Sequence, residues 1–287
     1  MNRAARIVCA IASALPVAGC APGVLDPAGP VASGERLILL DSLGIMLMLV
    51  VPVVLATFSI AWWFRAGNAR ATHRPDWAFS GRLELLVWSV PTLIVVFVAG
   101  LAWVGSHHLD PGRPLDASEP LRVQVVALDW KWLFIYPDQG VASVNRLVAP
   151  AGRPIAFRLT STSVMNSFFV PRLGSQIYAM AGMETRLNLR ADKPGSYRGL
   201  SANYSGKGFP GMAFTLDAVP TPTFDAWAAQ ARRNGPVLDG QGYAALLRDS
   251  ENVAPYTYRA VAPSLFDAIV RQSGTPHARF AIDGRAH

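Results

Sequence analysis

LGIMLMLVVPVVLATFSIAWWF, residues 43–64, carries no charged side chain from one end to the other. A second run, LLVWSVPTLIVVFVAGLAWV at residues 85–104, shares this property. About twenty consecutive apolar residues are enough for a helix that spans the hydrocarbon core of a bilayer. The whole chain is 51% hydrophobic and only 16% charged. We therefore predict a transmembrane helical hairpin over residues 43–104, in preference to a buried hairpin in a soluble protein.

Charges between the two runs predict the orientation of this hairpin. The connecting loop, at about residues 65–84, contains Arg65, Arg70, Arg74 and Arg82. Basic residues close to transmembrane helices favour the cytoplasmic side. We therefore expect a cytoplasmic loop, with the rest of the chain on the outer side of the membrane.

The N-terminus has the pattern of a lipoprotein signal peptide over residues 1–19. Basic residues precede the apolar core IVCAIASALPV, which is too short to span a bilayer. VAGC, residues 17–20, resembles a bacterial lipobox, which predicts cleavage before Cys20 and a lipid anchor on that cysteine. Ordinary cleavage with an incidental cysteine is the alternative. Either way, we expect an exported segment at residues 20–42, in a protein of the bacterial plasma (inner) membrane.

The chain beyond residue 120 reads as a globular domain on the outer, periplasmic side. Short runs with strand character, separated by Gly, Pro, Asn and Ser, predict an all-β sandwich over residues 121–219. The runs are LRVQVVAL (residues 121–128), WKWLFIY (130–136), PIAFRLT (154–160), SFFV (167–170), TRLNLR (185–190) and GMAFTLDAV (211–219). Residues 220–274 are rich in aromatic residues and show helical spacing in short stretches, and we expect a flexible tail at residues 275–287.

Three motifs identify a family resemblance. They are DWKWLFIYPDQG (residues 129–140), SVMNSFFVPRLGSQIYAMAGM (residues 163–183) and SANYSGKGFPGM (residues 201–212), in that order. The chain resembles subunit II of the haem–copper respiratory oxidases, and is most similar to the ubiquinol-oxidase branch of the cytochrome bo type. The resemblance implies a membrane α + β protein, in which a two-helix transmembrane hairpin is followed by a cupredoxin-like β-sandwich and short C-terminal helices.

The resemblance also implies a vacated metal site in the sandwich. The branch that oxidises cytochrome c holds a binuclear copper centre there, with His where this chain has Asn166. Its second loop has Cys, Glu, Cys, His and Met at positions that are here Ser201, Asn203, Ser205, Phe209 and Met212. Only the methionine is retained.

Ligand chemistry argues independently that copper does not bind in the sandwich. Such copper centres depend on soft thiolate and imidazole ligands. The two cysteines, Cys9 and Cys20, lie outside residues 121–219, as do all five histidines, His73, His107, His108, His277 and His287. We therefore predict no metal or redox centre in this chain, and the resemblance places haems and copper in subunit I.

The function implied by the resemblance is that of subunit II of a proton-pumping ubiquinol oxidase, which passes electrons from ubiquinol to O2. This chain would support subunit I, with subunits III and IV as further partners, and ubiquinol and lipid would be the small molecules involved. We expect no docking of cytochrome c and, since no basic run is present, no nucleic-acid binding. The alternatives are a cytochrome c oxidase subunit II with a binuclear copper centre and a lipid-anchored, cupredoxin-like structural protein.

A few further residues carry expectations. Glu84 lies at the cytoplasmic mouth of the second apolar run, and a carboxylate at a membrane edge is a candidate functional group. In the family, a Glu at the matching place is associated with proton uptake, whereas an interfacial Glu that is hydrated or paired with Arg82 is the alternative. We expect Trp130 and Trp132 to pack, and Asp129 and Lys131 to face subunit I or solvent.

Overall fold

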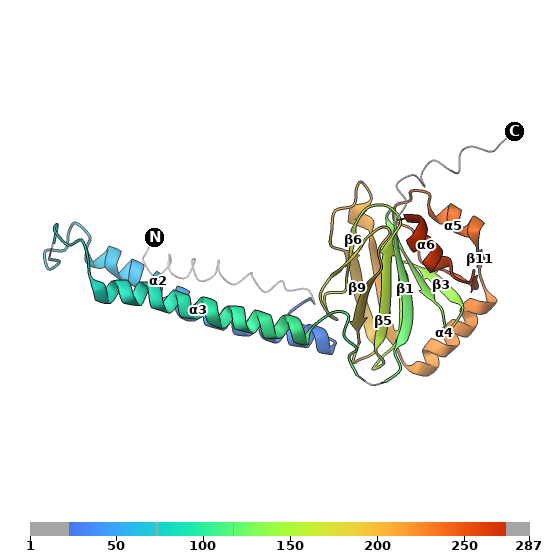
Figure 1. The fold of residues 1–287 in the computed structure, drawn as a ribbon, viewed down its shortest axis with the longest axis horizontal. Coiled ribbons are helices and arrows are strands. Elements are labelled where there is room, and N and C mark those ends of the chain that lie inside the picture. The colour runs from blue at the N-terminus through green and yellow to red at the C-terminus, as the bar shows by residue number, and fades with distance from the viewer. Residues whose placement is uncertain (1–22, 73, 117, 274–287) are drawn as a thin grey trace, which may run out of the picture. The chain divides into compact units, whose positions relative to one another are not determined.

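The computed structural model describes residues 23–72, 74–116 and 118–273, in two units. Residues 34–110 form a helical hairpin (Figure 1). The described residues before 34 and after 110 form a sandwich unit, so the stretch at residues 23–33 belongs to the sandwich although it leads into the first helix. The predicted signal peptide, Cys20, His73 and the predicted tail at residues 275–287 lie outside the described residues.

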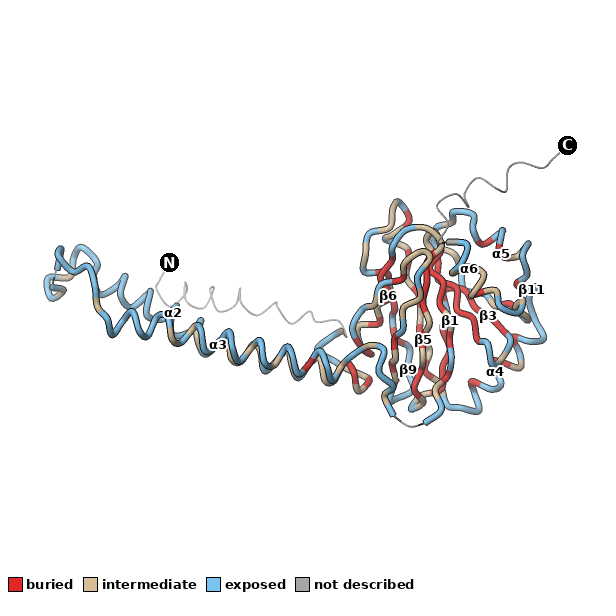
Figure 2. The backbone as a smooth tube through the Cα atoms, viewed as in Figure 1, coloured by how far each residue is buried: buried red, intermediate tan, exposed pale blue. Residues whose placement is uncertain are grey.

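The hairpin consists of α2 (Pro30–Trp63) and α3 (Gly81–His108), and both helices are long and apolar enough to cross a membrane. Figure 2 shows their surfaces almost wholly exposed. The helices approach closely where the start of α2 meets the end of α3. There Gly105 faces Ile38 and Gly34 faces Leu109, because a residue without a side chain lets two helices come near each other.

Each helix extends beyond the apolar run that predicts it. Pro30 opens α2, at a position where its fixed φ angle suits a helix and its missing N–H is not needed. The more polar residues that follow continue the same helix into the apolar run. Pro52 and Pro91 are accommodated within the two helices.

Two sheets face each other in the sandwich. One has six strands in the order β12 (Tyr256–Tyr258), β3 (Val141–Val144), β2 (Lys131–Tyr136), β1 (Leu121–Leu128), β5 (Ile155–Ser161) and β8 (Thr185–Leu189). The other has five, in the order β4 (Arg146–Pro150), β10 (Ala213–Val219), β9 (Gly195–Ser201), β6 (Asn166–Phe169) and β7 (Ile177–Ala179). Neighbouring strands are antiparallel except for β1 with β5 and β4 with β10, which are parallel.

A C-terminal segment follows the sandwich and returns to it. Its helices are α4 (Thr221–Arg233), α5 (Gly240–Leu246) and α6 (Leu265–Ser273). Two short strands, β11 (Val237–Leu238) and β13 (Ala260–Val261), pair with each other, and β12 joins the edge of the six-stranded sheet at β3. The segment is therefore part of the fold of the sandwich unit and not an appendage.

Strand β2 shows why this segment is needed. Every residue of β2 is buried, although side chains alternate between the two faces of a strand. Trp132, Phe134 and Tyr136 belong to the core between the sheets. Leu133 and Ile135 belong to a second core, which they share with residues of the C-terminal segment, among them Tyr243, Leu246, Phe266 and Ile269.

Aromatic rings fill the core between the sheets. The rings of Phe168 on β6 and Phe214 on β10 are stacked with centroids 4.9 Å apart. Trp132 on β2 meets Phe168 edge-on at 5.4 Å and Phe214 at 5.7 Å. Stacked and edge-on pairs are the favoured ring geometries, so this cluster ties the two sheets together.

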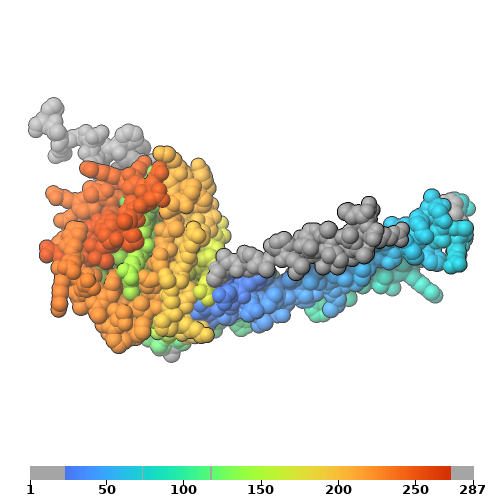
Figure 3. All heavy atoms as spheres, turned by 180° about the vertical axis from the view of Figure 1, so that it is seen from behind, coloured from blue at the N-terminus to red at the C-terminus, as the bar shows by residue number. Residues whose placement is uncertain are grey.

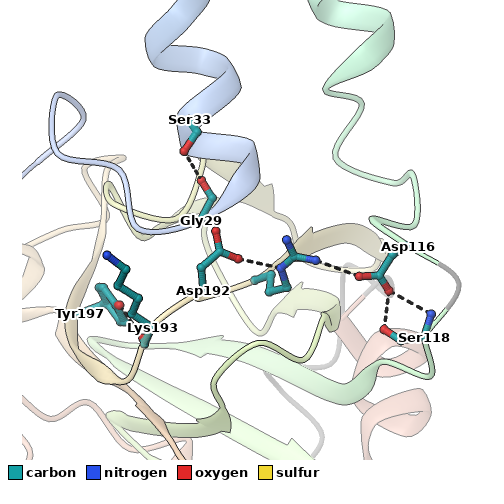
Figure 4. Close-up of polar contacts among 8 residues, drawn as sticks. Gly29, Ser33, Asp116, Ser118, Asp192, Lys193 and Tyr197 are labelled. Atoms are coloured by element: carbon teal, nitrogen blue, oxygen red, sulfur yellow. Dashed lines mark hydrogen bonds and ion pairs between the residues drawn. The ribbon is translucent and has the colours of Figure 1, made fainter.

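Both stretches that flank the hairpin contact one turn of the sandwich, at residues 190–193. The N–H of Asp192 donates to the carbonyl of Ala28 over 2.9 Å, just before α2. Arg190 donates to Asp192 over 2.8 Å and to Asp116, in the stretch after α3, over 2.9 Å, and Figure 4 shows these two acids. Hydrogen bonds from Ser118, with a smaller contribution from Arg190, lower the pKa of Asp116. The turn thus holds the chain where it enters and leaves the sandwich unit.

These elements confirm the expected fold class. Two long apolar helices precede a two-sheet sandwich, and short helices follow it.

Candidate functional site

The positions that the resemblance predicts to be vacated copper ligands lie in and around two neighbouring strands of the sandwich. Ser201 ends β9 and Asn166 begins β6, and these neighbouring strands pair with each other. The hydroxyl of Ser201 donates to Oδ1 of Asn166 over 3.1 Å, and both residues are buried. The side-chain amide of Asn166 in turn donates to the carbonyl of Val164. Polar atoms at these two positions therefore satisfy one another.

The remaining positions are also engaged within the protein. Asn203 donates to the carbonyl of Met165 over 3.1 Å. The hydroxyl of Ser205 lies 3.8 Å from the sulfur of Met212, which is 2% exposed. The structure thus brings Asn166 to Ser201 and Ser205 to Met212 as two adjacent pairs.

Phe209 makes a different side-chain contact, although its carbonyl accepts the backbone N–H of Met212 over 3.0 Å. It begins η2, a short 3-10 helix at Phe209–Gly211, and its ring meets that of Tyr204 edge-on at 5.6 Å. Tyr204 is itself 74% exposed. An aromatic contact at the surface therefore stands where the copper-binding branch has an imidazole.

Trp130 braces the loop from the side of β2. Its backbone has a φ of 62°, in the left-handed region that a tryptophan rarely adopts. In this conformation the indole ring lies against Gly206 and Gly208, and its N–H donates to the carbonyl of Ser205 over 3.0 Å. The expected packing role of Trp130 thus includes a directional hydrogen bond to the loop at residues 201–212, which we call the vacated loop.

The donors present at these positions do not fit a binuclear copper centre. The copper-binding branch has two thiolates, two imidazoles, a carboxylate and a thioether at these positions. This chain has two hydroxyls, two amides and one thioether there. Hydroxyls and amides are poor ligands for copper. Among the described residues, no three His, Cys, Asp or Glu side chains gather as a metal site would require.

The expectation for Lys131 was wrong. Its residue surface is only 2% exposed, in the middle of the DWKW motif. The ammonium donates to the carbonyl of Arg248 over 2.8 Å, the hydroxyl of Ser250 over 2.5 Å and the carbonyl of Asp129 over 3.3 Å. Burial lowers the pKa of Lys131, and the charges of Asp129 and Asp249 partly oppose that shift. The overlooked signal was its position in a strand whose neighbours are apolar on both faces.

Glu84 lies in the first turn of α3, as its place in the sequence indicated. Its carboxylate accepts a hydrogen bond from the indole N–H of Trp88 over 3.1 Å, one helical turn further on. Both side chains are exposed in this chain, so the carboxylate is open to water or to a partner subunit. At the other end of α3, Nδ1 of His107 lies 2.8 Å from the carbonyl of Trp103.

Two family models match the chain. Residues 139–219 match the model described as "Cytochrome C oxidase subunit II, periplasmic domain", and residues 232–276 match "COX Aromatic Rich Motif". The first covers most of the sandwich with its vacated positions, and the second covers most of the C-terminal segment.

Whole-length relatives agree with these models. The chain is 49% identical over 263 residues to "Ubiquinol oxidase subunit 2" of Acetobacter aceti, covering 91% of this chain and 85% of that one. It is 47% identical to "Cytochrome bo(3) ubiquinol oxidase subunit 2" of Pseudomonas putida, covering 88% and 81%. A solved structure, the periplasmic domain of subunit II of cytochrome oxidase of Bradyrhizobium japonicum, is 24% identical with a TM-score of 0.39, and covers 41% of this chain and 98% of that domain.

Copper retention tests whether the sandwich lacks the ligands for a copper centre. Because thiols and imidazoles are missing from residues 121–219, we expect the purified chain to retain less than about 0.1 copper per chain after dialysis. The positive control combines Asn166→His, Ser201→Cys, Ser205→Cys and Phe209→His, which returns the soft donors beside Met212 and should increase copper retention. Stoichiometric copper on the unaltered chain, measured by elemental analysis, would show that the assignment is wrong.

Proposed function

The chain belongs to the ubiquinol oxidase subunit 2 family, and we propose that it supports electron transfer from ubiquinol to O2 without carrying a redox centre of its own. It is a subunit of a ubiquinol oxidase, an oxidoreductase complex of respiratory electron transport, and other oxidase subunits are its partners. It is membrane-anchored, with two helices of spanning length. The alternative, a cytochrome c oxidase subunit II with a binuclear copper centre, is not favoured.

The observation that carries the proposal is the content of the vacated loop. A water-soluble cytochrome donates electrons outside the membrane and so needs a relay in the exported domain. A quinol is soluble in lipid and reaches its oxidant within the bilayer. The hydroxyls of Ser201 and Ser205, engaged with Asn166 and Met212, suit a protein that no longer needs that relay.

The finer assignments follow from this role. We propose that the main partner is subunit I, which carries the haems and copper, with subunits III and IV completing a proton-pumping complex. We further propose that the complex lies in the bacterial inner membrane, with the sandwich on the periplasmic side. The hairpin would pack against subunit I, which would account for the many apolar side chains exposed on α2 and α3.

Donor specificity of the intact complex tests this function. The complex, purified through a tag on this chain, should consume O2 with a ubiquinol analogue and be at least about a hundredfold slower with reduced cytochrome c, because this chain offers no metal relay for a soluble donor. Oxygen uptake in an electrode cell measures both rates on one sample. Faster turnover with cytochrome c would reject the proposal.

We propose that Glu84 takes part in proton uptake from the cytoplasm. Its carboxylate lies in the first turn of α3 next to the arginine-bearing loop and is exposed. Glu84→Ala should lower ubiquinol oxidation about tenfold, which corresponds to about 1.4 kcal/mol of activation free energy. Asp76→Asn, which removes a carboxylate from the neighbouring loop, is the control and should leave turnover unchanged. Equal rates for Glu84→Ala and the unaltered complex, in steady-state oxygen uptake, would remove Glu84 from the pathway.

We also propose that Cys20 becomes the lipid-modified N-terminus of the mature chain. Asp26, six residues after Cys20, already pairs with Arg172 of the sandwich unit, so the lipid would be attached close to that unit in sequence. Mass spectrometry of the mature N-terminal peptide should show an acylated Cys20, and Cys20→Ser should abolish the acyl mass. An unmodified Cys20, or a mature chain that begins elsewhere, would reject the lipid anchor.

A further inference from the structure

The C-terminal segment reaches the vacated loop through the stretch at residues 248–253, between α5 and β12. Figure 3 shows the orange-to-red atoms of the C-terminal segment gathered on one side of the sandwich. Residues 248–253 carry no regular secondary structure, so side-chain and backbone contacts to the sandwich must hold them in place. We call this stretch the clasp.

Lys131 fastens the clasp to β2. Its side chain shares the outer face of the strand with Leu133 and Ile135, the face that the C-terminal segment covers. The two shortest hydrogen bonds of its ammonium go to the carbonyl of Arg248 and the hydroxyl of Ser250, both in the clasp. The N–H of Ser250 returns a bond to the carbonyl of Asp129 over 3.4 Å. A buried ammonium is tolerated only where such acceptors surround it.

Asn145 fastens the other end of the clasp. It follows β3 with a left-handed φ of 54° and is 7% exposed. Its Oδ1 accepts the backbone N–H of Trp132 over 2.8 Å, and its side-chain amide donates to the carbonyl of Val253 over 2.8 Å. The clasp is therefore anchored by Lys131, which belongs to β2, and by Asn145, which is hydrogen-bonded to Trp132 of β2.

Between these anchors the clasp touches the vacated loop directly. A Cβ on Gly211 would lie 2.4 Å from Oδ1 of Asn252, so only glycine leaves room for this contact. Asn252 itself has a left-handed φ of 52°. Nζ of Lys207, in the loop, also lies 3.3 Å from Oε1 of Glu251 in the clasp. This ion pair is at the surface, since the lysine side chain is 85% exposed.

The loop is thus held from two sides. Trp130 supports it with the ring packed on Gly206 and Gly208, and the next residue, Lys131, holds the clasp that meets Gly211. Trp130 and Lys131 are consecutive residues of the DWKW motif, so a single peptide bond joins the residue that supports the loop to the residue that holds the clasp.

We infer that the clasp and Lys131 hold the vacated loop in its folded position. In a loop that binds a metal ion, the ion would have this structural role. The inference rests on the proposed absence of metal from this loop. A metal that joins several side chains contributes its binding free energy to the folded state. Without it, a loop rich in glycine loses that restraint, and contacts from another part of the chain have to supply it.

The three lysines of this chain provide a graded test. Lys131→Met keeps most of the aliphatic stem and removes all three hydrogen bonds. Lys207→Met removes only the exposed pair with Glu251, and Lys193→Met alters an exposed lysine of another turn. Hydrogen–deuterium exchange of the assembled oxidase, followed by mass spectrometry, reports on residues 201–212 and residues 247–256 in the same experiment.

Lys131→Met should speed exchange about tenfold in both stretches and leave β1 and β5 unchanged, because local opening becomes easier when the fastening is lost. Lys207→Met should have an effect of less than about twofold, since exposed ion pairs contribute little, and Lys193→Met none. If the complex with Lys131→Met does not assemble, Ser250→Ala is the substitute, because it removes only one acceptor of the Lys131 ammonium. It should speed exchange about threefold in both stretches.

The outcomes separate this inference from the one it rests on. Faster exchange in residues 247–256 alone would show that the clasp is fastened by Lys131 but does not hold the loop, and no change in either stretch would remove Lys131 from this role. Copper found in the loop of the unaltered complex would instead overturn the metal-free assignment, whatever the exchange rates.

Discussion

The outer face of β2 has to be covered by protein, and much of the sandwich unit follows from that constraint. Antiparallel sheets often leave one face to water, but β2 presents Leu133 and Ile135 on the face away from the sandwich core. Burying that face requires a third layer, which the C-terminal segment supplies through Tyr243, Leu246, Phe266 and Ile269. The cover also makes a buried lysine possible at the end of the same face, because it brings the carbonyl of Arg248 and the hydroxyl of Ser250 within reach.

Much of the fold could be predicted from local sequence, since apolar runs, β-branched residues and turn residues act within short windows. Strand β1 was found in this way, and its bounds, Leu121–Leu128, match the predicted run. Strand β9 was missed because Gly195, Ser196 and Gly199 have low strand preference, and its pairing with β10 and β6 decides its conformation instead. Lys131 was misplaced for a related reason. The apolar neighbours of Lys131 were a local sign of burial, but the carbonyl of Arg248 that accepts its hydrogen bond is separated by 117 residues in sequence, so the local sequence could not show what receives the ammonium.

The vacated site, too, could be predicted from the sequence only in part. The missing thiols and imidazoles can be counted in the sequence, and the count alone makes copper a poor occupant. What stands in place of the ligands depends on three-dimensional neighbours. Ser201 finds Asn166 across a strand pair, and Trp130 adopts a left-handed backbone to reach the carbonyl of Ser205. Under the proposed function these contacts leave the exported domain a structural part of the oxidase, while electrons enter from the lipid phase.

An experimental density map of the assembled oxidase, detailed enough to place the side chains of the vacated loop, tests the central claim most directly. The result we expect is a loop at residues 201–212 filled by protein, with Ser201 bonded to Asn166 and the indole of Trp130 bonded to the carbonyl of Ser205. A strong isolated density peak between Ser201, Ser205 and Met212, with an anomalous signal at the copper edge, would contradict it. Such a peak would mean that this chain carries a redox centre after all.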